Sequence, residues 1–248
     1  MVHLDKTTDT ILRGKITITQ MKHGYRYGFD AVCLAAFVNG YLRKNKKDLS
    51  LADVGSGVGT ISLILALKNK NLKISSIENN EEFIEIAKEN VLKNKFHNSI
   101  KTVNYDIFNI NKNLKNHFDI VVSNPPFNNK NSNKSNNKFI DVAKRIVDLE
   151  KWMEGCVYLL KEKGTLCIIL PTNILDVVLV SLRDKAGSFK IYPIWPNTKK
   201  SSKRIILLAK KGGISPTELL PGLKLYNNKG VESKKASLLS EEGILNFY

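Results

Sequence analysis

Hydrophobic and polar positions along the chain alternate between two patterns. Short apolar runs bounded by polar or glycine-containing turns predict strands, and longer stretches with hydrophobic residues every three or four positions predict helices. The predicted core strands cover residues 49–54, 73–77, 100–103, 118–122, 164–170, 188–192 and 204–210. The predicted helices cover residues 29–42, 60–68, 81–92, 141–160 and 173–186. A β-like alternation at 15–20 precedes the first helix.

Strands that alternate with helices in this way predict an α/β fold whose mostly parallel sheet is covered by helices on both faces. We interpret residues 1–248 as a single domain with an N-terminal cover at 1–28, a core at 29–212 and a variable tail at 213–248. An Asn-, Lys- and Ser-rich run at 128–138 has too few apolar residues to bury a core.

Composition changes this picture mainly through charge. Of 248 residues, 39 are basic and 23 acidic, which gives a formal net charge of +16, and the 42% hydrophobic content is typical of a globular protein. The basic excess favours a polyanionic partner, nucleic acid before an anionic membrane surface. The alternative is a general enrichment in lysine and asparagine that produces the same excess without such a partner.

Several classes of protein are disfavoured. No apolar run reaches the ~18–20 residues of a membrane span, and Asp5 and Asp9 stand where a signal peptide would be apolar. Cys33, Cys156 and Cys167 lie in apolar surroundings at distant spacings, which favours buried, reduced thiols. The four histidines show no metal-ligand spacing. We therefore expect a cytoplasmic protein with no metal site, and we favour a monomer.

A glycine-rich loop, Asp53-Val-Gly55-Ser-Gly57-Val-Gly59, joins the first predicted core strand to its helix. Glycines allow a sharp turn and a close approach of ligand to backbone, and the helix start favours a negative group. The loop differs from the dinucleotide pattern Gly-x-Gly-x-x-Gly, and an acid stands two positions before its first glycine. That acid would repel a pyrophosphate but can bind an ammonium group or a water. S-adenosylmethionine, with an amino group, a sulfonium and no phosphate, fits this loop.

Acidic residues follow the next two predicted strands at the same edge of the sheet. Glu78, followed by Asn79, stands about 20 residues beyond the loop, where a carboxylate can accept both hydroxyls of an adenosine ribose. Asp106, followed by Ile107, can accept a hydrogen bond from an adenine amino group, with turn capping as its alternative role. We predict that these residues line one cofactor crevice together with the glycine loop.

The segment Ser123-Asn124-Pro125-Pro126-Phe127 follows the fourth predicted core strand. Because the prolines fix φ and remove backbone donors, the Asn124 side-chain oxygen and the Pro125 carbonyl can accept both hydrogens of a planar NH2 group. This localises the nitrogen lone pair and turns it toward the methyl group, so positioning replaces a strong general base. Phe127 offers a face for a flat substrate. We predict these four residues, from Asn124 on, to be catalytic, and Asn124 also to contact the cofactor; a loop terminator followed by a core phenylalanine is the alternative.

With these motifs the chain resembles the class I S-adenosylmethionine-dependent methyltransferases of the small-domain type that modify exocyclic or amide nitrogens. A narrower resemblance, to the bacterial valine tRNA adenine-37 N6-methyltransferase group, is carried by residues 20–30, 31–37, 204–211 and Leu225-Tyr226. The resemblance implies a Rossmann-like fold with a mostly parallel seven-stranded sheet. It also implies that Tyr27 and Asp30 close over the methionine end of the cofactor. Members often have tyrosine in place of Phe127, so stacking is retained and a hydroxyl contact is lost.

Two groups of basic residues can contact the phosphates of an RNA substrate. The first follows the catalytic motif directly and suits contacts around a flipped-out base, and the second precedes the last predicted core strand. The candidates are Lys130, Lys134 and Lys138 in the first group and Lys199, Lys200 and Arg204 in the second. The alternatives are an insertion without contacts and a solvated loop.

These features predict an S-adenosylmethionine-dependent enzyme that methylates the exocyclic N6 amine of adenine, with tRNA as the expected substrate. The first alternative is a protein glutamine N5-methyltransferase of the release-factor type, because a side-chain amide presents the same NH2 geometry. Methylation of guanine N2 in rRNA is a subsidiary alternative. A non-catalytic RNA-binding module that retains the fold is an alternative of another class, disfavoured by the intact Asp53, Glu78 and Asn124.

Overall fold

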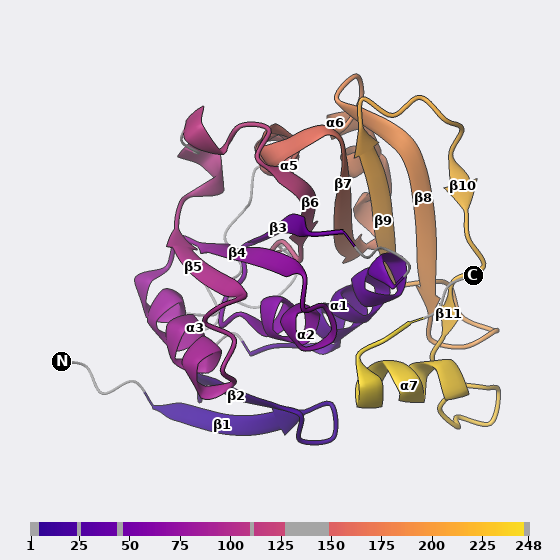
Figure 1. Ribbon diagram of the computed structural model, residues 1–248. Helices are drawn as coiled ribbons and strands as arrows, with labels where there is room; N and C mark the ends of the chain where they lie inside the picture. Colours follow the sequence, from indigo (N-terminus) through magenta and orange to yellow (C-terminus); the bar gives the residue numbers. More distant parts are fainter. Residues whose placement is uncertain (1–4, 24–25, 44–46, 110–111, 127–148, 246–248) are drawn as a thin grey trace.

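A central β-sheet with helices on both faces organises the structure (Figure 1), a computed structural model in which residues 5–23, 26–43, 47–109, 112–126 and 149–245 are described. The strands are β1 (Lys6–Ile11), β2 (Ile16–Met21), β3 (Leu49–Val54), β4 (Leu72–Glu78), β5 (Ile100–Asn104), β6 (Phe118–Ser123), β7 (Leu160–Pro171), β8 (Ala186–Trp195), β9 (Arg204–Lys211), β10 (Glu218–Leu219) and β11 (Leu223–Lys224). The helices are α1 (Phe29–Leu42), α2 (Thr60–Lys68), α3 (Glu81–Lys93), α5 (Leu149–Leu159), α6 (Leu175–Ser181) and α7 (Lys234–Glu242), and short 3-10 turns cover Ile107–Asn109, Lys112–Leu114 and Thr172–Ile174.

The seven predicted core strands are all present, in the order β5-β4-β3-β6-β7-β9-β8. Neighbouring strands from β5 to β7 run parallel, whereas β9 runs antiparallel to both β7 and β8. Among the described residues the sheet nevertheless has nine strands and not seven, because the two-residue strands β10 and β11 pair in parallel with β8. Strands this short carry no periodic signal, so the sequence pattern did not predict them.

Alternating burial in the strands explains how both faces of the sheet are covered. In β7, Leu166, Ile168 and Leu170 pack into one hydrophobic cluster, whereas Cys167 and Ile169 pack into the other. Successive side chains of a strand point to opposite faces, so a strand buried on both faces is a continuous apolar run. The first cluster includes α5 and α6, and the second includes α1, α2 and α3.

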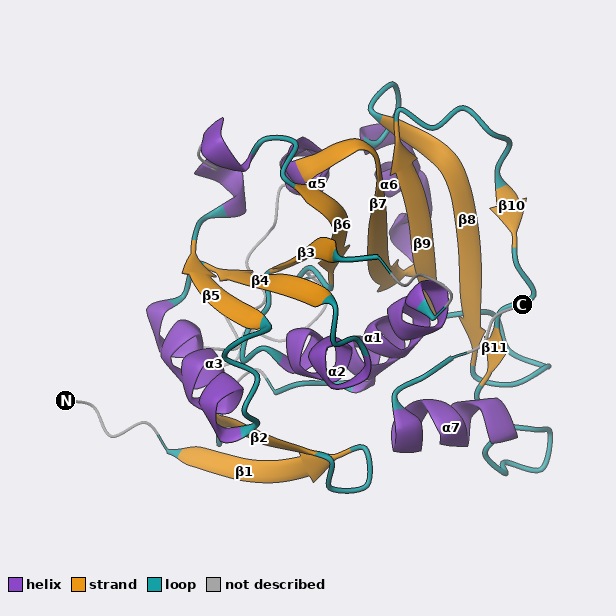
Figure 2. Cartoon of the chain, viewed as in Figure 1, coloured by secondary structure: helices purple, strands orange, loops and turns teal. Residues whose placement is uncertain are grey.

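The N-terminal cover contains an antiparallel hairpin, β1–β2, which lies beneath α2 and α3 (Figure 2). Two asparagines of α3 complete the pairing of β2. Asn90 accepts a hydrogen bond from the Thr19 amide at 2.7 Å and donates to its carbonyl at 2.8 Å, and Asn94 pairs in the same way with Thr17 at 2.9 and 2.7 Å. These side-chain amides satisfy backbone groups that an edge strand would otherwise expose.

Between residues 213 and 245 the tail contains β10, β11 and α7. Ser233 caps α7 by accepting a hydrogen bond from the Ala236 amide at 3.2 Å, and the Leu245 amide donates to the Ala36 carbonyl of α1 at 3.0 Å. The helix predicted at 173–186 is shorter, since α6 ends at Ser181. Of the helix predicted at 141–160, α5 forms the second half, and residues 141–148 lie outside the described residues.

The strand order places a crevice between β3 and β6. The chain proceeds outward from β3 through β4 to β5 and then returns to the other side of β3 as β6. At such a reversal the loops leave the two neighbouring strands in opposite directions, and open α/β sheets bind ligands at this point, outside the carboxyl ends of the strands. Here those ends carry the glycine loop after Val54 and the motif that begins at Asn124.

None of the helices in the described part of the chain combines the length and apolar character that a membrane crossing requires. The three cysteines are free and buried, as predicted, and burial raises the pKa of each thiol above its ordinary value.

Candidate active site

The glycine loop adopts a conformation that requires glycine. Gly55, Gly57 and Gly59 have φ angles of +70°, +55° and +86°. At Gly55 a Cβ atom would also lie 3.0 Å from two ring carbons of Trp152. The loop therefore packs tightly from below, and its glycines leave the backbone open to a ligand, as expected of a cofactor cradle.

Trp152, on α5, contacts both the glycine loop that follows β3 and the end of β6. It was not among the site residues predicted from the sequence. Its side chain is 7% exposed, and its indole Nε1 donates to Ser123 Oγ at 3.1 Å. Ser123 Oγ in turn donates to the Val54 carbonyl at 2.9 Å. The ends of β3 and β6 are thus tied together beside the ring that supports Gly55. The sequence placed Trp152 in the helix predicted at 141–160, but no sequence signal shows which loop it contacts.

Asp53 lies beneath the glycine loop and is fully buried. Its Oδ2 accepts hydrogen bonds from the amide and hydroxyl of Ser62 on α2, at 3.1 and 2.7 Å. Within the described residues, Oδ1 has no hydrogen-bond partner. Burial raises the pKa of the Asp53 carboxyl group to about 7, the Glu78 carboxylate acts in the same direction, and the bonds from Ser62 oppose both. Its predicted role near the cofactor stays a prediction.

The raised pKa of Asp53 predicts a distinctive pH dependence of stability. An aspartate titrates near 3.9 in an unfolded chain and near 7 here, so between these values the folded state keeps a proton that the unfolded state has lost. The free energy of unfolding therefore falls as pH rises, by about 4 kcal/mol in total for this group. Asp53→Asn lacks the titration. In urea unfolding, the wild type should lose stability relative to Asp53→Asn between pH 4.5 and 7.5, and a constant difference would contradict the assignment.

Glu78, the last residue of β4, fixes the glycine loop from the side. Its Oε2 accepts a hydrogen bond from the Gly57 amide at 2.9 Å, and its Oε1 accepts from the amides of Asn79 and Asn80 at 2.9 and 3.0 Å. A carboxylate offers about four acceptor positions, so one stays open. The predicted acceptance of two ribose hydroxyls therefore requires one backbone bond to be exchanged.

Asp106 caps a turn at the carboxyl end of β5. Its Oδ1 accepts from the Phe108 amide at 3.0 Å, which is the alternative role considered for it. Ile107 is buried against Gly155, and a Cβ atom at Gly155 would lie only 2.8 Å from Ile107. Asn79 is exposed. Contacts of Asp106, Ile107 and Asn79 with the cofactor stay predictions.

The Asn124-Pro125-Pro126 segment begins directly after the anchored Ser123. Pro125 is buried, and Asn124 and Pro126 are half-buried. Within the described part of the chain, the Asn124 side-chain amide has no hydrogen-bond partner, and its contacts with substrate and cofactor stay predictions. Phe127 lies outside the described residues.

The segment before α1 reaches the same edge of the sheet. Asp30 stands in the first turn of α1, and its Oδ2 accepts a hydrogen bond from Arg204 Nε, at the start of β9, at 2.7 Å. The Tyr27 amide donates to Gln20 Oε1 at 3.2 Å, and partial burial raises the pKa of the Tyr27 hydroxyl. Arg204, predicted to contact RNA, thus has an internal carboxylate partner. Its phosphate contact stays a prediction.

The other predicted RNA contacts divide into two groups. Lys199 and Lys200 are exposed in the loop between β8 and β9. This loop precedes Arg204, which pairs with Pro171 at the carboxyl end of β7, so it lies at the edge that carries the crevice. Lys130, Lys134 and Lys138 lie outside the described residues.

Comparison with known proteins assigns this architecture. The family model described as "methyltransferase small domain" matches residues 36–174, more than half of the chain, and includes both the glycine loop and the Asn124 segment. The chain belongs to the methyltransferase small domain family. This methyltransferase uses S-adenosylmethionine, and the glycine loop fits such a cofactor because its three glycines, all at positive φ, carry no side chain that would stand between backbone and ligand.

Relatives of known name point in two directions. A Bacteroides thetaiotaomicron protein named tRNA1(Val) (adenine(37)-N6)-methyltransferase is 28% identical over 231 residues, 92% of this chain and 87% of that protein. A release factor glutamine methyltransferase from Bacillus anthracis is 38% identical over 86 residues, which cover 32% of this chain and 27% of that protein. The first likeness spans nearly the whole methyltransferase, whereas the second spans a third of it.

Solved structures confirm the fold. A predicted O-methyltransferase from Agrobacterium tumefaciens matches with a TM-score of 0.72 at 19% identity and covers 88% of this chain and 97% of its own. The 16S rRNA N2 G1207 methyltransferase of T. thermophilus, in complex with AdoMet and guanosine, has a TM-score of 0.56 at 16% identity, with 83% and 50% covered. The methyltransferase is therefore Rossmann-like, as predicted. Within its described residues no group of three or more potential metal ligands occurs.

Proposed function

We propose that this methyltransferase transfers a methyl group to the N6 amine of adenine in tRNA. The observation that carries the proposal is the position of Asn124, which is half-buried at the switch point of the sheet. The preceding residue, Ser123, is hydrogen-bonded to the end of β3 and to Trp152. An acceptor there faces the crevice shared with the glycine loop. Adenine in tRNA is favoured over a protein amide because the relatives named for it match up to 92% of the chain, against 32% for the release factor enzyme.

The chain's own residues act on the amine by orientation. Bound S-adenosylmethionine supplies an electrophilic methyl group on a sulfonium. The Asn124 amide oxygen and the Pro125 carbonyl accept the two amine hydrogens, which holds the nitrogen lone pair out of the ring and toward the methyl group. Neither proline has an N–H, so neither competes with the substrate as a donor at these positions. Phe127 stacks on the base, and one amine proton is released after transfer.

The residues proposed to hold the cofactor surround the ends of β3, β4, β5 and β6 and the start of α1. They are Tyr27, Asp30, Asp53, Gly55, Gly57, Gly59, Glu78, Asn79, Asp106, Ile107 and Asn124. The exposed Lys199 and Lys200, beside the same edge, are proposed to contact tRNA phosphates.

Incubation with labelled S-adenosylmethionine and either unmodified tRNA or release factor tests this proposal. We expect label in tRNA and N6-methyladenosine in the nucleoside digest, detected by mass spectrometry. Label confined to the release factor would establish the amide substrate instead. In a third incubation with unmodified rRNA, label recovered as N2-methylguanosine would place the enzyme with the guanine methyltransferases.

A further inference from the structure

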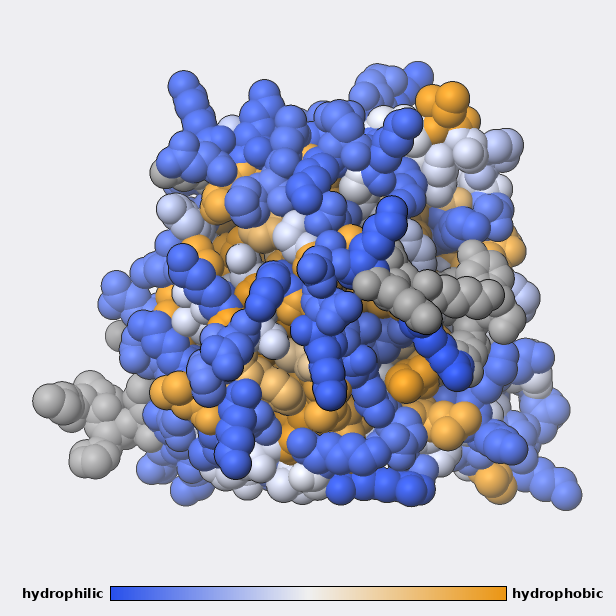
Figure 3. Space-filling view, viewed as in Figure 1, coloured by the Kyte–Doolittle hydropathy of each residue, from blue (hydrophilic) through white to orange (hydrophobic). Residues whose placement is uncertain are grey.

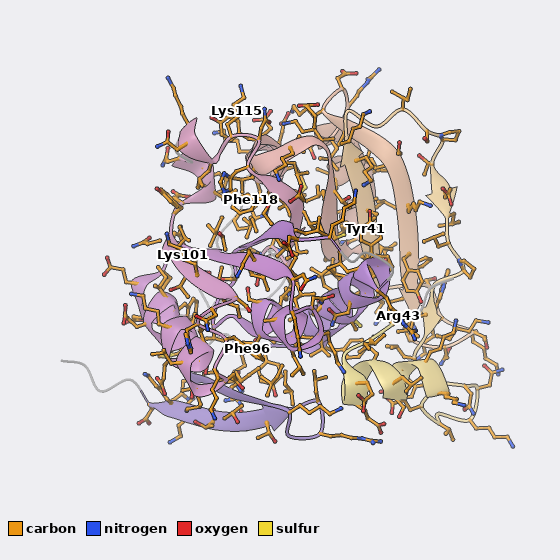
Figure 4. The ribbon with its side chains drawn as sticks, viewed as in Figure 1. Tyr41, Arg43, Phe96, Lys101, Lys115 and Phe118 are labelled. Carbon is orange, nitrogen blue, oxygen red and sulfur yellow. The ribbon has the colours of Figure 1, made fainter. Side chains whose placement is uncertain are left out.

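A cavity of about 820 Å³ lies at the edge of the sheet opposite the crevice. Its walls are the carboxyl ends of α1 and α2, the starts of β3 and β4, and α7. Figure 3 views this side of the molecule, where hydrophobic side chains are visible over α7 between strongly hydrophilic ones. Figure 4 places Arg43, a lining residue, close to α7. The volume falls within the range of about 300–1,000 Å³ that is usual for ligand sites.

The lining joins a cationic rim to an apolar floor. The basic lining residues are Arg43, Lys47, Lys68, Lys70, Lys234 and Lys235, and the acidic one is Glu242. The Glu242 carboxylate is already paired with Lys15 at 2.6 Å and with Lys68 at 3.5 Å. Leucines from α1, β3 and β4 contribute to the floor. A ligand that matches both parts has an anionic group and a flat apolar body, as a nucleotide has.

The wall formed by α7 is held in place by the rest of the chain. Arg13 and Lys15 in the hairpin turn form ion pairs with Glu241 and Glu242. The Asn39 side-chain amide donates to the Gly243 carbonyl at 2.7 Å. Because α7 is tied at several points, Lys234 and Lys235 in its first turn have a fixed position. No acidic residue offsets them in that turn, where the helix dipole already favours an anion.

The cavity and the crevice lie at the two ends of one strand. Leu49 lines the cavity at the start of β3, and Val54 ends that strand at the glycine loop. Six residues at about 3.3 Å each give a separation of roughly 20 Å. About six stacked nucleotides, at roughly 3.4 Å each, span that length. Because β3 is buried inside the sheet, an RNA that contacts both places follows the protein surface, along a path longer than this straight distance.

We propose that this cavity is a second RNA contact, in which the basic rim binds the backbone phosphates and the leucine floor receives an unstacked base of the same RNA. The inference rests on the proposed function, because it takes the RNA to be the methylation substrate. The cavity contributes affinity and register, while the transfer itself takes place at the opposite edge.

The test is a double charge reversal, Lys234→Glu with Lys235→Glu, in the full-length protein. We expect its affinity for unmodified tRNA, measured by fluorescence anisotropy, to fall at least tenfold. The slope of log affinity against log salt concentration should decrease by about 2, since two phosphate contacts are lost. The KM for tRNA should rise with kcat unchanged, and cofactor affinity should stay within twofold. Leu238→Ser, at a lining position that is 44% exposed, should weaken tRNA binding several-fold without unfolding the chain.

The matched control is Lys88→Glu with Lys101→Glu, which changes the net charge equally at two exposed positions outside the cavity. Figure 4 shows Lys101 well away from Arg43. If control and cavity variants lose the same affinity, the effect is one of net charge and the cavity proposal is wrong, while the proposed function stands. A wild-type enzyme that methylates no tRNA overturns both. Retention of affinity by Lys234→Arg with Lys235→Arg supports a phosphate contact.

Discussion

Replacement of Asn124 by alanine is expected to reduce methyl transfer by about 10³-fold or more while cofactor affinity stays within a few-fold. Loss of a single preorganised hydrogen-bonding group from an active site costs about 10²–10³ in rate. Here the loss also returns the amine lone pair to conjugation with the ring. The cofactor should still bind, because its proposed cradle is built mainly by the glycine loop and Glu78. Single-turnover methylation and calorimetry of cofactor binding measure the two effects separately.

Asn124→Asp is the matched variant for this prediction. It keeps an acceptor oxygen at the same position and changes the side-chain volume little, so it should retain activity well above that of Asn124→Ala. A structural role for Asn124 would give the opposite result, since a charge at this half-buried position would destabilise the fold more than alanine does. Near-normal turnover by Asn124→Ala would show that the orientation mechanism is wrong.

The fold could be predicted from the sequence wherever one element carried its own pattern. The continuous apolar run around Cys167 predicted a strand buried on both faces, and the structure places alternate side chains of β7 in two clusters. Two-residue strands such as β10 have no period to detect, and the nine-residue helix α7, capped locally by Ser233 and Gly243, lay in a segment for which no element was predicted. The strand order at the switch point depends on how distant segments pair, so no local pattern predicted it.

The candidate site was predictable where backbone geometry demanded particular residues. The positive φ angle at Gly55 favours glycine, and the absence of backbone donors after Asn124 requires proline, so both features can be recognised from residue type. Contacts made by tertiary packing cannot be recognised in this way. The packing of Trp152 against Gly55 and the ion pair of Asp30 with Arg204 each join residues more than 90 positions apart in the sequence. The same holds for the cavity beside α7, whose basic lining residues appear in the sequence only as scattered positive charge.

Truncation of Trp152 to alanine is expected to have the largest effect on stability, a loss of about 3–5 kcal/mol, as is usual for a buried tryptophan. The indole is 7% exposed and packs edge-on against Phe108, with 5.9 Å between the ring centroids. Two of its ring carbons lie 3.0 Å from the position that a Cβ atom at Gly55 would take. Its loss leaves a void directly under the glycine loop. Cofactor affinity should therefore fall about tenfold, on top of the lower melting temperature. Urea unfolding and calorimetry at a temperature where the variant is folded measure both.

Trp152→Phe tests how much of this effect depends on the indole itself. Phenylalanine keeps an aromatic ring in the core, but it lacks both the bond from Nε1 to Ser123, worth about 1 kcal/mol, and the indole carbons Cζ2 and Cη2 that lie under Gly55. Ser123 Oγ still donates to the Val54 carbonyl, so the ends of β3 and β6 stay joined. We therefore expect Trp152→Phe to lose less cofactor affinity than Trp152→Ala, because its ring fills part of the void under the loop. If the alanine variant binds the cofactor normally once folded, the ring stabilises the core without positioning the loop.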